Sequence, residues 1–300
     1  MFEKKNLVFY YCTTPLHMGA GTSVGAIDNP IQREVHSGHP LIAGSGLKGA
    51  VRHHVKQQWI GERQKDIVPL FGSENNSSEL AAGSISFTDA NLIAFPVRSV
   101  KNTFVYITCP YALGRLKRMA AMAGLKFDWD ISGIKIKSGS TDSALIEGKL
   151  CLEALEFEAT EDEDTSDIAE WIADNCLQGD ENIFFKEKIQ SDFFVLSDDD
   201  FNYFVKQSTV VEPHVRINDE TGTAEDGALF YTENLPPESI LVGIVLASVE
   251  RGSKDNRMSA DQCLNKALYE KDGISGQLVQ MGGDSTTGRG LVLINAVKGE

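Results

Sequence analysis

Runs of apolar and polar residues divide the first part of the chain into strands and helices. Residues 7–12, LVFYYC, are apolar at consecutive positions, which is typical of a strand that is buried on both faces. Residues 45–59 carry apolar side chains every three to four positions, which predicts an amphipathic helix with Ser45 as its N-cap. Alternating runs at 83–89 and 103–109 predict further strands.

The middle of the chain combines short strands, helices and acidic segments. Strands are expected within 149–159, and a helix is expected over 166–178. Another helix begins after Ser197, whose hydroxyl is a suitable N-cap. The acidic run 198–200 then occupies the first turn, where the helix dipole favours anions, so a structural role explains it better than a metal site does.

The last hundred residues repeat the order of strand, helix and strand. Two strand-like runs, 209–217 and 239–247, flank a polar segment that is rich in turn residues, as expected of a protruding hairpin. A helix near 259–271 and a terminal strand at 291–297 follow. This order occurs at both ends of the chain. It predicts an α+β fold of two split β-α-β halves of ferredoxin-like type, with insertions between them.

Charge is distributed unevenly along the chain. The net charge of −15 argues against a nucleic-acid partner, because phosphate binding needs a positive surface. Residues 1–126, however, hold 14 Lys and Arg against 8 Asp and Glu, a net charge of +6, and the remainder carries −21. One part of the chain could therefore face phosphate while acidic loops keep the rest soluble; a chance asymmetry is the alternative.

Composition points to a cytoplasmic protein without a membrane partner. No apolar run approaches the length of a membrane span, and no cleavage site follows a long apolar segment at the N-terminus. The five cysteines are far apart and form no C-x-x-C pair. Free thiols in a reducing compartment are therefore expected.

A long loop from residue 13 to about residue 43 carries the first candidate site. Asp28 lies in it before a turn-forming Asn-Pro pair, and no apolar helix follows that it could cap. His17, just past the first strand, is placed to touch whatever Asp28 touches. His36 and His39 suggest a metal site, but no carboxylate or cysteine pattern completes one.

The predicted helix at 45–59 carries a basic stripe. Lys48, Arg52 and Lys56 recur every four residues beside the apolar face. Ser45, Gly46 and the amides of the first turn add donors at the same end, which makes a credible seat for a phosphate. A merely solvated face is the alternative, and it is the better explanation for Lys56.

A glycine-rich segment near the C-terminus has the spacing of a phosphate-binding loop without its chemistry. Arg289 stands where a P-loop has lysine, and a strand follows instead of a helix. A nucleoside triphosphatase is therefore disfavoured. Gly288 and Gly290 still permit close approach of a ligand to the backbone, and Arg289 can bind a phosphate through two hydrogen bonds. An ordinary tight turn is the alternative.

Several separated motifs, in order, resemble the repeat-associated mysterious protein (RAMP) superfamily of CRISPR effector subunits. The sequence is most similar to the backbone subunit of the type III-B, or Cmr-type, RNA-targeting complex. The motifs are TTPLHMGAG (13–21), AIDNPIQRE (26–34), LIAGSGLKGAVR (41–52), ETGTAEDGALFYTENLPPESI (220–240) and QMGGDSTTGRGLV (280–292).

The resemblance implies one RAMP domain with an RRM-like palm and a β-hairpin thumb. The palm would comprise about 1–126 and 236–300, the insertion about 127–208, and the thumb about 209–235. Copies of the chain would stack in a helical filament along the CRISPR guide RNA, together with other Cmr-type subunits. The subunit would cleave the complementary target RNA at regular intervals in antiviral defence.

The resemblance also assigns roles to individual residues. It places the catalytic acid on Asp28 and brings the thumb acids Glu225 and Asp226 near the target strand, in a supporting role. Guide-backbone contacts fall on the helix motif and on the C-terminal glycine-rich motif. These contacts are Ser45, Lys48, Arg52, Gly288, Arg289 and Gly290.

RNA chemistry is consistent with a carboxylate at position 28. A 2′-hydroxyl that attacks the adjacent phosphorus needs a base, a stabiliser of negative charge and an in-line geometry. Asp28 could be that base, or it could hold a divalent metal, Mg²⁺, against a phosphate oxygen. Two alternatives are a non-catalytic RNA scaffold of the same fold and a metal-independent nuclease that trims guide RNA with His17.

Overall fold

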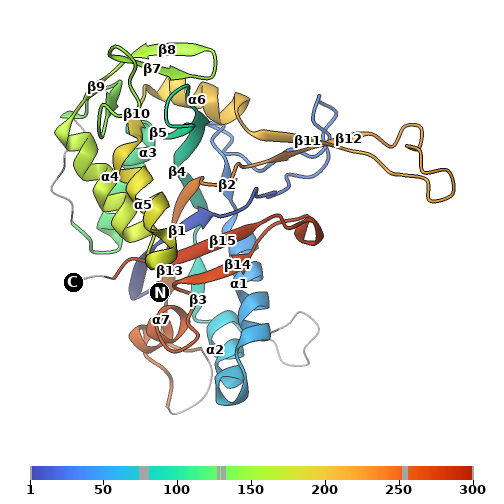
Figure 1. Ribbon diagram of the computed structural model, residues 1–300. Coiled ribbons are helices and arrows are strands. Elements are labelled where there is room, and N and C mark those ends of the chain that lie inside the picture. The colour runs from blue at the N-terminus through green and yellow to red at the C-terminus, as the bar shows by residue number, and fades with distance from the viewer. Residues whose placement is uncertain (1, 74–80, 127–128, 130–132, 252–255, 299–300) are drawn as a thin grey trace.

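A computed structural model describes residues 2–73, 81–126, 129, 133–251 and 256–298 of the chain. One large sheet with helices on both faces forms the body, and a long two-stranded arm projects from it (Figure 1). The sheet contains eleven strands. No helix in the described ranges has the length and apolar character needed to cross a membrane.

The main sheet has the strand order β14-β15-β1-β13-β4-β5-β10-β6-β9, with β2 paired to β4 and β3 paired to β13. Its strands are β1 Lys4–Cys12, β2 Leu41–Ile42, β3 Ile85–Phe87, β4 Ala90–Arg98, β5 Phe104–Thr108, β6 Ser138–Gly139, β9 Thr160–Glu161, β10 Phe193–Val195, β13 Ile240–Ala247, β14 Gln277–Gln280 and β15 Leu291–Ala296. Two hairpins stand apart from it: β7 Lys149–Leu152 with β8 Leu155–Glu158, and β11 Val210–His214 with β12 Phe230–Asn234.

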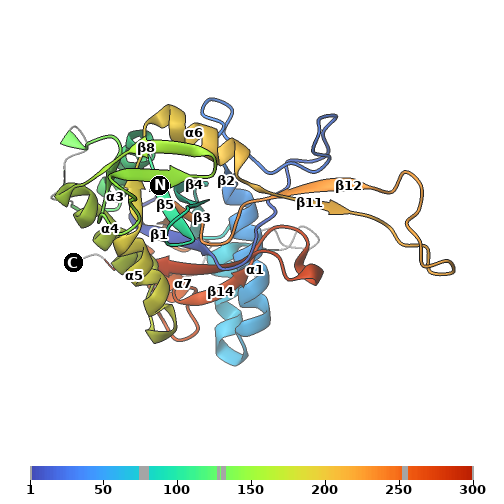
Figure 2. The same ribbon diagram turned by 45° about the horizontal axis from the view of Figure 1, so that its top comes forward.

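Helices connect these strands and cover the sheet (Figures 1 and 2). The α-helices are α1 Gly44–Gln58, α2 Ile67–Phe71, α3 Pro110–Met122, α4 Glu163–Cys176, α5 Ile183–Ser191, α6 Asp198–Gln207 and α7 Ala260–Leu268. Short 3₁₀ turns are η1 Gly61–Asp66, η3 Asp180–Asn182 and η4 Ser285–Thr287.

Four antiparallel strands, β15-β1-β13-β4, form the centre of the sheet. The chain passes from β1 through α1 to β4, yet β13 lies between these two strands. It passes from β13 through α7 to β15, and β1 lies between these two. Both β-α-β units are therefore split, and the expected α+β class is confirmed.

Alternate side chains of β1 enter two separate cores, as a strand with two buried faces requires. Leu7, Phe9 and Tyr11 pack with residues of α3 and α4 on one face of the sheet. Val8 and Tyr10 pack with residues of α1 and α7 on the other face. The prediction of a central strand from consecutive apolar residues is confirmed, and the strand is longer than expected.

Two local predictions were wrong. The second arm of the hairpin is β12, and the run 239–247 forms β13, which is buried between β1 and β4. Ala43 is the N-cap residue of α1, and Ser45 is an exposed residue of its first turn. The Gly44 N–H donates instead to the Asp89 carboxylate at 2.8 Å, so a distant residue satisfies the helix end.

Other local predictions hold. Ser197 caps α6, because its hydroxyl oxygen accepts a hydrogen bond from the Asp200 N–H at 3.1 Å. The cysteines form no disulfide, and all but Cys151 are buried. The expected boundary of the palm at residue 127 lies outside the described residues.

The end of the long loop after β1 is fixed to the body by a buried ion pair. The Glu34 carboxylate accepts hydrogen bonds from both Nη atoms of Arg115 on α3, and from Asn91 at 2.7 Å. Both charged side chains are less than a tenth exposed. Burial opposes ionisation of Glu34, but the hydrogen bonds from Arg115 and Ser37 and the charge of Arg115 outweigh it and lower the pKa of Glu34.

Replacing Arg115 with alanine should leave the Glu34 carboxylate buried without its cation. We expect the free energy of unfolding to fall by about 3 to 5 kcal/mol, measured by denaturant titration. Arg118→Ala, at an exposed position of the same helix, is the control and should change stability little. Equal effects of the two substitutions would show that the ion pair does not anchor the loop.

Candidate functional site

The loop after β1 covers one edge of strand β12, which belongs to the hairpin β11–β12 that we call the thumb. Tyr231 donates its N–H to Oδ2 of Asp28 at 2.7 Å, and the Asn29 N–H donates to the Tyr231 carbonyl at 3.0 Å. The Glu233 N–H then donates to the Asn29 carbonyl at 3.0 Å. The opposite edge of β12 pairs with β11. Asp28 is thus held, half-buried, at the base of the thumb by backbone contacts.

His17 contacts the same edge of β12. Its Nδ1 lies 2.7 Å from the Glu233 carbonyl oxygen, which can only accept, so Nδ1 carries the proton and Nε2 of the neutral ring is an acceptor. The backbone atoms that His17 and Asp28 contact belong to residues two positions apart, about 7 Å along a strand. The structure therefore brings these two predicted residues to one short stretch of the thumb base.

Glu233 organises this stretch, and sequence patterns did not indicate it. Its carboxylate lies 2.5 Å from Nη2 of Arg33 and accepts hydrogen bonds from the Ile31 N–H at 3.0 Å and the Thr209 hydroxyl at 2.9 Å. The Glu233 side chain is only 4% exposed. It ties the loop to both arms of the thumb. The only indication in the sequence is a carboxylate on a strand residue whose side chain points inward. That orientation becomes apparent only once the register of β12 is known.

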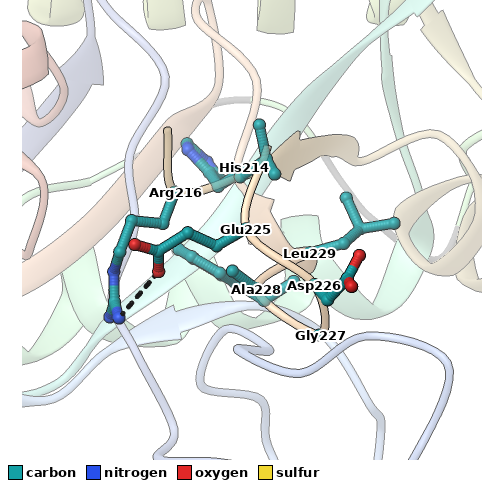
Figure 3. Close-up of a pocket in the computed structure, with 9 residues that line it drawn as sticks. His214, Arg216, Glu225, Asp226, Gly227, Ala228 and Leu229 are labelled. Carbon is teal, nitrogen blue, oxygen red and sulfur yellow. Dashed lines mark hydrogen bonds and ion pairs between the residues drawn. The ribbon is translucent and has the colours of Figure 1, made fainter. Parts of the chain in front are cut away.

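The thumb acids lie in the distal part of the hairpin, away from these contacts. Glu225 and Asp226 line a pocket of about 500 Å³ (Figure 3). Figure 3 shows Glu225 turned towards Arg216, with Asp226 on the other side of the turn; the Glu225 carboxylate is 3.4 Å from Arg216 Nη1. No hydrogen bond or ion pair joins Asp28 to either acid in the part of the chain that the structure describes.

The C-terminal glycine-rich loop packs against the thumb base. Arg289 Nη2 donates to both carboxylate oxygens of Glu212 on β11, at 2.6 and 2.5 Å. Gly288 and Gly290 both have φ of +78°, and a Cβ at Gly290 would lie 1.9 Å from the Met281 carbonyl oxygen. Arg289 is therefore engaged within the chain, and a phosphate could reach it only by sharing or displacing Glu212.

The basic stripe on α1 lies apart from Asp28. Lys48 Nζ donates to the Ile85 carbonyl on β3 at 2.9 Å. Burial lowers the pKa of Lys48, and the positive charges of Arg251 and Arg52 lower it further. No carboxylate pairs with Lys48 among the residues described. An anion beside this cluster would relieve the repulsion, and Ser45 is exposed one turn away.

Potential metal ligands are sparse around Asp28. Across the described ranges, no group of three or more His, Cys, Asp or Glu side chains is arranged to hold a metal ion. Mg²⁺ commonly keeps several waters and binds one or two carboxylates together with substrate phosphates. The Asp28 carboxylate fits such a shared site, with RNA as the second ligand, and does not fit a cage built by protein alone.

The chain is similar to known proteins over almost its whole length. The model of the RAMP superfamily matches residues 9–292. The CRISPR system Cmr endoribonuclease Cmr4 of Pyrococcus furiosus is 36% identical over 97% of this chain and 95% of its own, and the CMR subunit Cmr4 of Saccharolobus solfataricus is 26% identical over 95% and 94%.

Two solved structures are also similar to this chain over almost its whole length. The crystal structure of oligomeric Cmr4 from Pyrococcus furiosus has a TM-score of 0.72 at 28% identity, over 99% of this chain and all of that one. The Cmr-beta complex bound to cognate target RNA contains a chain with a TM-score of 0.76 at 21% identity, over 98% of both. The second likeness shows the fold alone.

Glu233→Gln should loosen the loop from the thumb, because it removes the charge that binds Arg33. A lost charge-assisted hydrogen bond of about 1.5 to 3 kcal/mol predicts roughly 10- to 100-fold faster amide hydrogen exchange at Asn29 and Ile31, measured by mass spectrometry or NMR. Glu212→Gln on the neighbouring strand is the matched control and should leave these amides unchanged. Unchanged exchange in Glu233→Gln would show that the backbone contacts suffice.

Proposed function

Because the chain belongs to the RAMP superfamily, we propose that it is the backbone subunit of a type III-B CRISPR complex. In this role it binds guide RNA and acts in the cytoplasm as an endoribonuclease on the complementary target RNA, in antiviral defence. The observation that carries the proposal is the placement of Asp28 and His17 on one edge of the thumb base. The full-length similarity to a Cmr endoribonuclease supports it.

The architecture supports a division into palm and thumb. The central order β15-β1-β13-β4, with both β-α-β units split, is that of a ferredoxin-like or RRM-like palm. The hairpin β11–β12 and its distal turn form the thumb (Figures 1 and 2). The thumb is long enough to lie across bound RNA, while the loop that carries Asp28 remains fixed at its base.

Guide RNA would run along the cationic face of α1. Lys48 and Arg52 offer charge to the phosphates, and a phosphate contact positions the strand without reading its sequence. Further copies of the chain would occupy successive segments of the same RNA and, with other Cmr-type subunits, form a filament. The oligomeric state of the Pyrococcus furiosus relative supports such self-association.

The cleavage chemistry would follow from a fixed carboxylate beside the target strand. The hydrogen bond from Tyr231 to one oxygen orients Asp28 and leaves the second oxygen to take the proton of a 2′-hydroxyl. In the alternative role, Asp28 would hold a divalent metal, Mg²⁺, together with an RNA phosphate, and the metal would supply a positive charge beside that phosphate. The thumb would hold the sugar and phosphate in line for the attack.

The tautomer of His17 favours a second candidate function, metal-independent cleavage of guide precursor. The Glu233 carbonyl fixes the proton on Nδ1 and leaves Nε2 as a base. Product analysis with and without a chelator separates the candidates. Metal-dependent target cleavage stops in chelator, guide processing by His17 continues, and a pure scaffold cuts neither RNA.

Asp28→Asn should abolish most target cleavage without loss of assembly. The substitution keeps the size of the side chain but removes the base and the charge, so the single-turnover rate should fall by about 10² to 10⁴. Asp219→Asn, in the exposed distal turn, is the control and should cleave like the parent. Binding of guide and target should persist in both, because position 28 is not part of the core. A parental rate in Asp28→Asn would exclude it as the catalytic acid.

Lys48→Ala should weaken guide binding equally for all sequences. Loss of one phosphate contact on a single strand should also reduce the slope of log affinity against log salt by about 0.7, measured by titration at several salt concentrations. Lys56→Ala, at an exposed position two turns along the same helix, is the matched control. If both variants bind as the parent does, the stripe is a solvated face.

A further inference from the structure

The ring of His17 lies between two glycines that are far apart in the sequence. A Cβ atom at Gly19 would lie 2.9 Å from Nε2 of His17, and a Cβ atom at Gly283 would lie 3.2 Å from its Cδ2. Both distances are shorter than an ordinary van der Waals contact of 3.4 to 4 Å. Neither glycine has a positive φ, so the backbone conformation does not require glycine there. The space that the ring occupies is what disfavours a side chain at both positions.

The C-terminal glycine-rich loop also holds the backbone around His17. The Gly283 N–H donates to the His17 carbonyl oxygen at 2.9 Å, and the Gly290 N–H donates to the Pro15 carbonyl oxygen at 2.8 Å. The Met281 N–H donates to the Gly290 carbonyl oxygen at 2.8 Å and closes the base of the loop. Both ends of this loop therefore bind the segment that carries His17, which places Gly283 beside the ring.

The two glycines and the thumb base together restrict the ring. Its Nδ1 is directed at the Glu233 carbonyl oxygen, 2.7 Å away. In the described ranges no hydrogen bond occupies Nε2, and His17 is only half-buried. A methyl group at position 19 would press on Nε2, and one at position 283 would press on the adjoining Cδ2. Either would have to push the ring away from the Glu233 carbonyl or crowd the nitrogen that is free to act as a base.

We propose that Gly19 and Gly283 are positioning residues for His17. They keep the Nδ1–H on the Glu233 carbonyl and leave Nε2 open to the RNA. The inference rests on the proposed function, in which His17 is the candidate base for cleavage without metal, and it adds the residues that orient this base. On this proposal the C-terminal glycine-rich motif has two tasks. Its later residues, 288–290, face the guide backbone, and Gly283 holds the ring of His17.

The first measurement follows the tautomer of His17 and needs no activity. NMR of the full-length protein with isotope-labelled histidine, at a pH well above the ordinary pKa of an imidazole, distinguishes a proton on Nδ1 from one on Nε2. The parent should show His17 with its proton on Nδ1. Gly19→Ala and Gly283→Ala should each mix the two tautomers, because the ring no longer meets the Glu233 carbonyl. His17→Gln assigns the signal, and the signals of the other histidines report that each variant is folded.

The second measurement is single-turnover cleavage of guide precursor, with binding of the same RNA measured alongside. Each alanine variant should cut about 10- to 100-fold more slowly and bind with the parental affinity, because a small misplacement of a reacting group costs up to about 10²-fold. In His17→Gln, the addition of Gly19→Ala should cause no further loss, since the glycine acts through the ring. A merely structural role would weaken binding and would add to the loss in the double variant.

Gly25→Ala is the matched control. Gly25 lies in the same loop as Gly19 and has no positive φ, and the nearest atom to a Cβ there is the Ser23 hydroxyl oxygen, at an ordinary 3.4 Å. This variant should keep the parental tautomer of His17 and the parental rate.

The positioning role is overturned if both alanine variants keep the parental tautomer. It is also overturned if they change the tautomer and cut at the parental rate although His17→Gln does not, or if the losses of Gly19→Ala and His17→Gln multiply. The proposed role of His17 has a separate readout. If the parent does not cut guide precursor, or if His17→Gln cuts it like the parent, that role fails, and the tautomer alone decides whether the glycines position the ring.

Discussion

The buried carboxylate of Glu233 is the contact on which the candidate site depends. It joins Arg33 and the Ile31 amide of the long loop to the first arm of the thumb through Thr209. A buried ion pair of this kind adds little net stability compared with apolar packing, but loss of one partner is costly. It therefore specifies one position of the loop. The geometry of Asp28 and His17 relative to the thumb follows from it.

A second contact anchors the end of the same loop, and it is made by the neighbouring residue Glu34. Arg33 turns to the thumb and Glu34 turns to Arg115 on α3, so two consecutive charged residues bind opposite partners. A segment of this length with only isolated β-bridges would otherwise sample many conformations, at a considerable entropic cost. A buried ion pair holds it against the body and a partly buried one holds it against the thumb, and this rigidity suits a catalytic side chain.

Local charge, more than net charge, decides whether a surface suits an RNA backbone. The cations on α1, beside β3, suit the phosphates of a strand that is held independently of its sequence. The negative net charge of the chain does not exclude RNA binding, because Lys48, Arg52 and Arg251 form a local cluster of positive charge.

Sequence patterns predicted the central strand, the amphipathic α1 and α7, and the cap of α6, because each depends on residues close together in the chain. They misplaced the second arm of the thumb, since 239–247 and β12 are both plausible strands and only tertiary pairing distinguishes them. Asp28 and His17 were both identified from the sequence, and the role of Asp28 came from the resemblance. Glu233 was not identified. The engagement of Arg289 by Glu212 was also not predictable, because the two residues are 77 positions apart.

We expect Glu233 to act on cleavage by holding the loop that carries Asp28. A double-mutant cycle of single-turnover target cleavage, with Asp28→Asn, Glu233→Gln and the double variant, tests it most directly. If Glu233 acts through Asp28, the double variant should cleave no more slowly than Asp28→Asn alone. If the two losses multiply, Glu233 contributes independently of Asp28, and the account of the loop as a rigid carrier of the catalytic acid is contradicted.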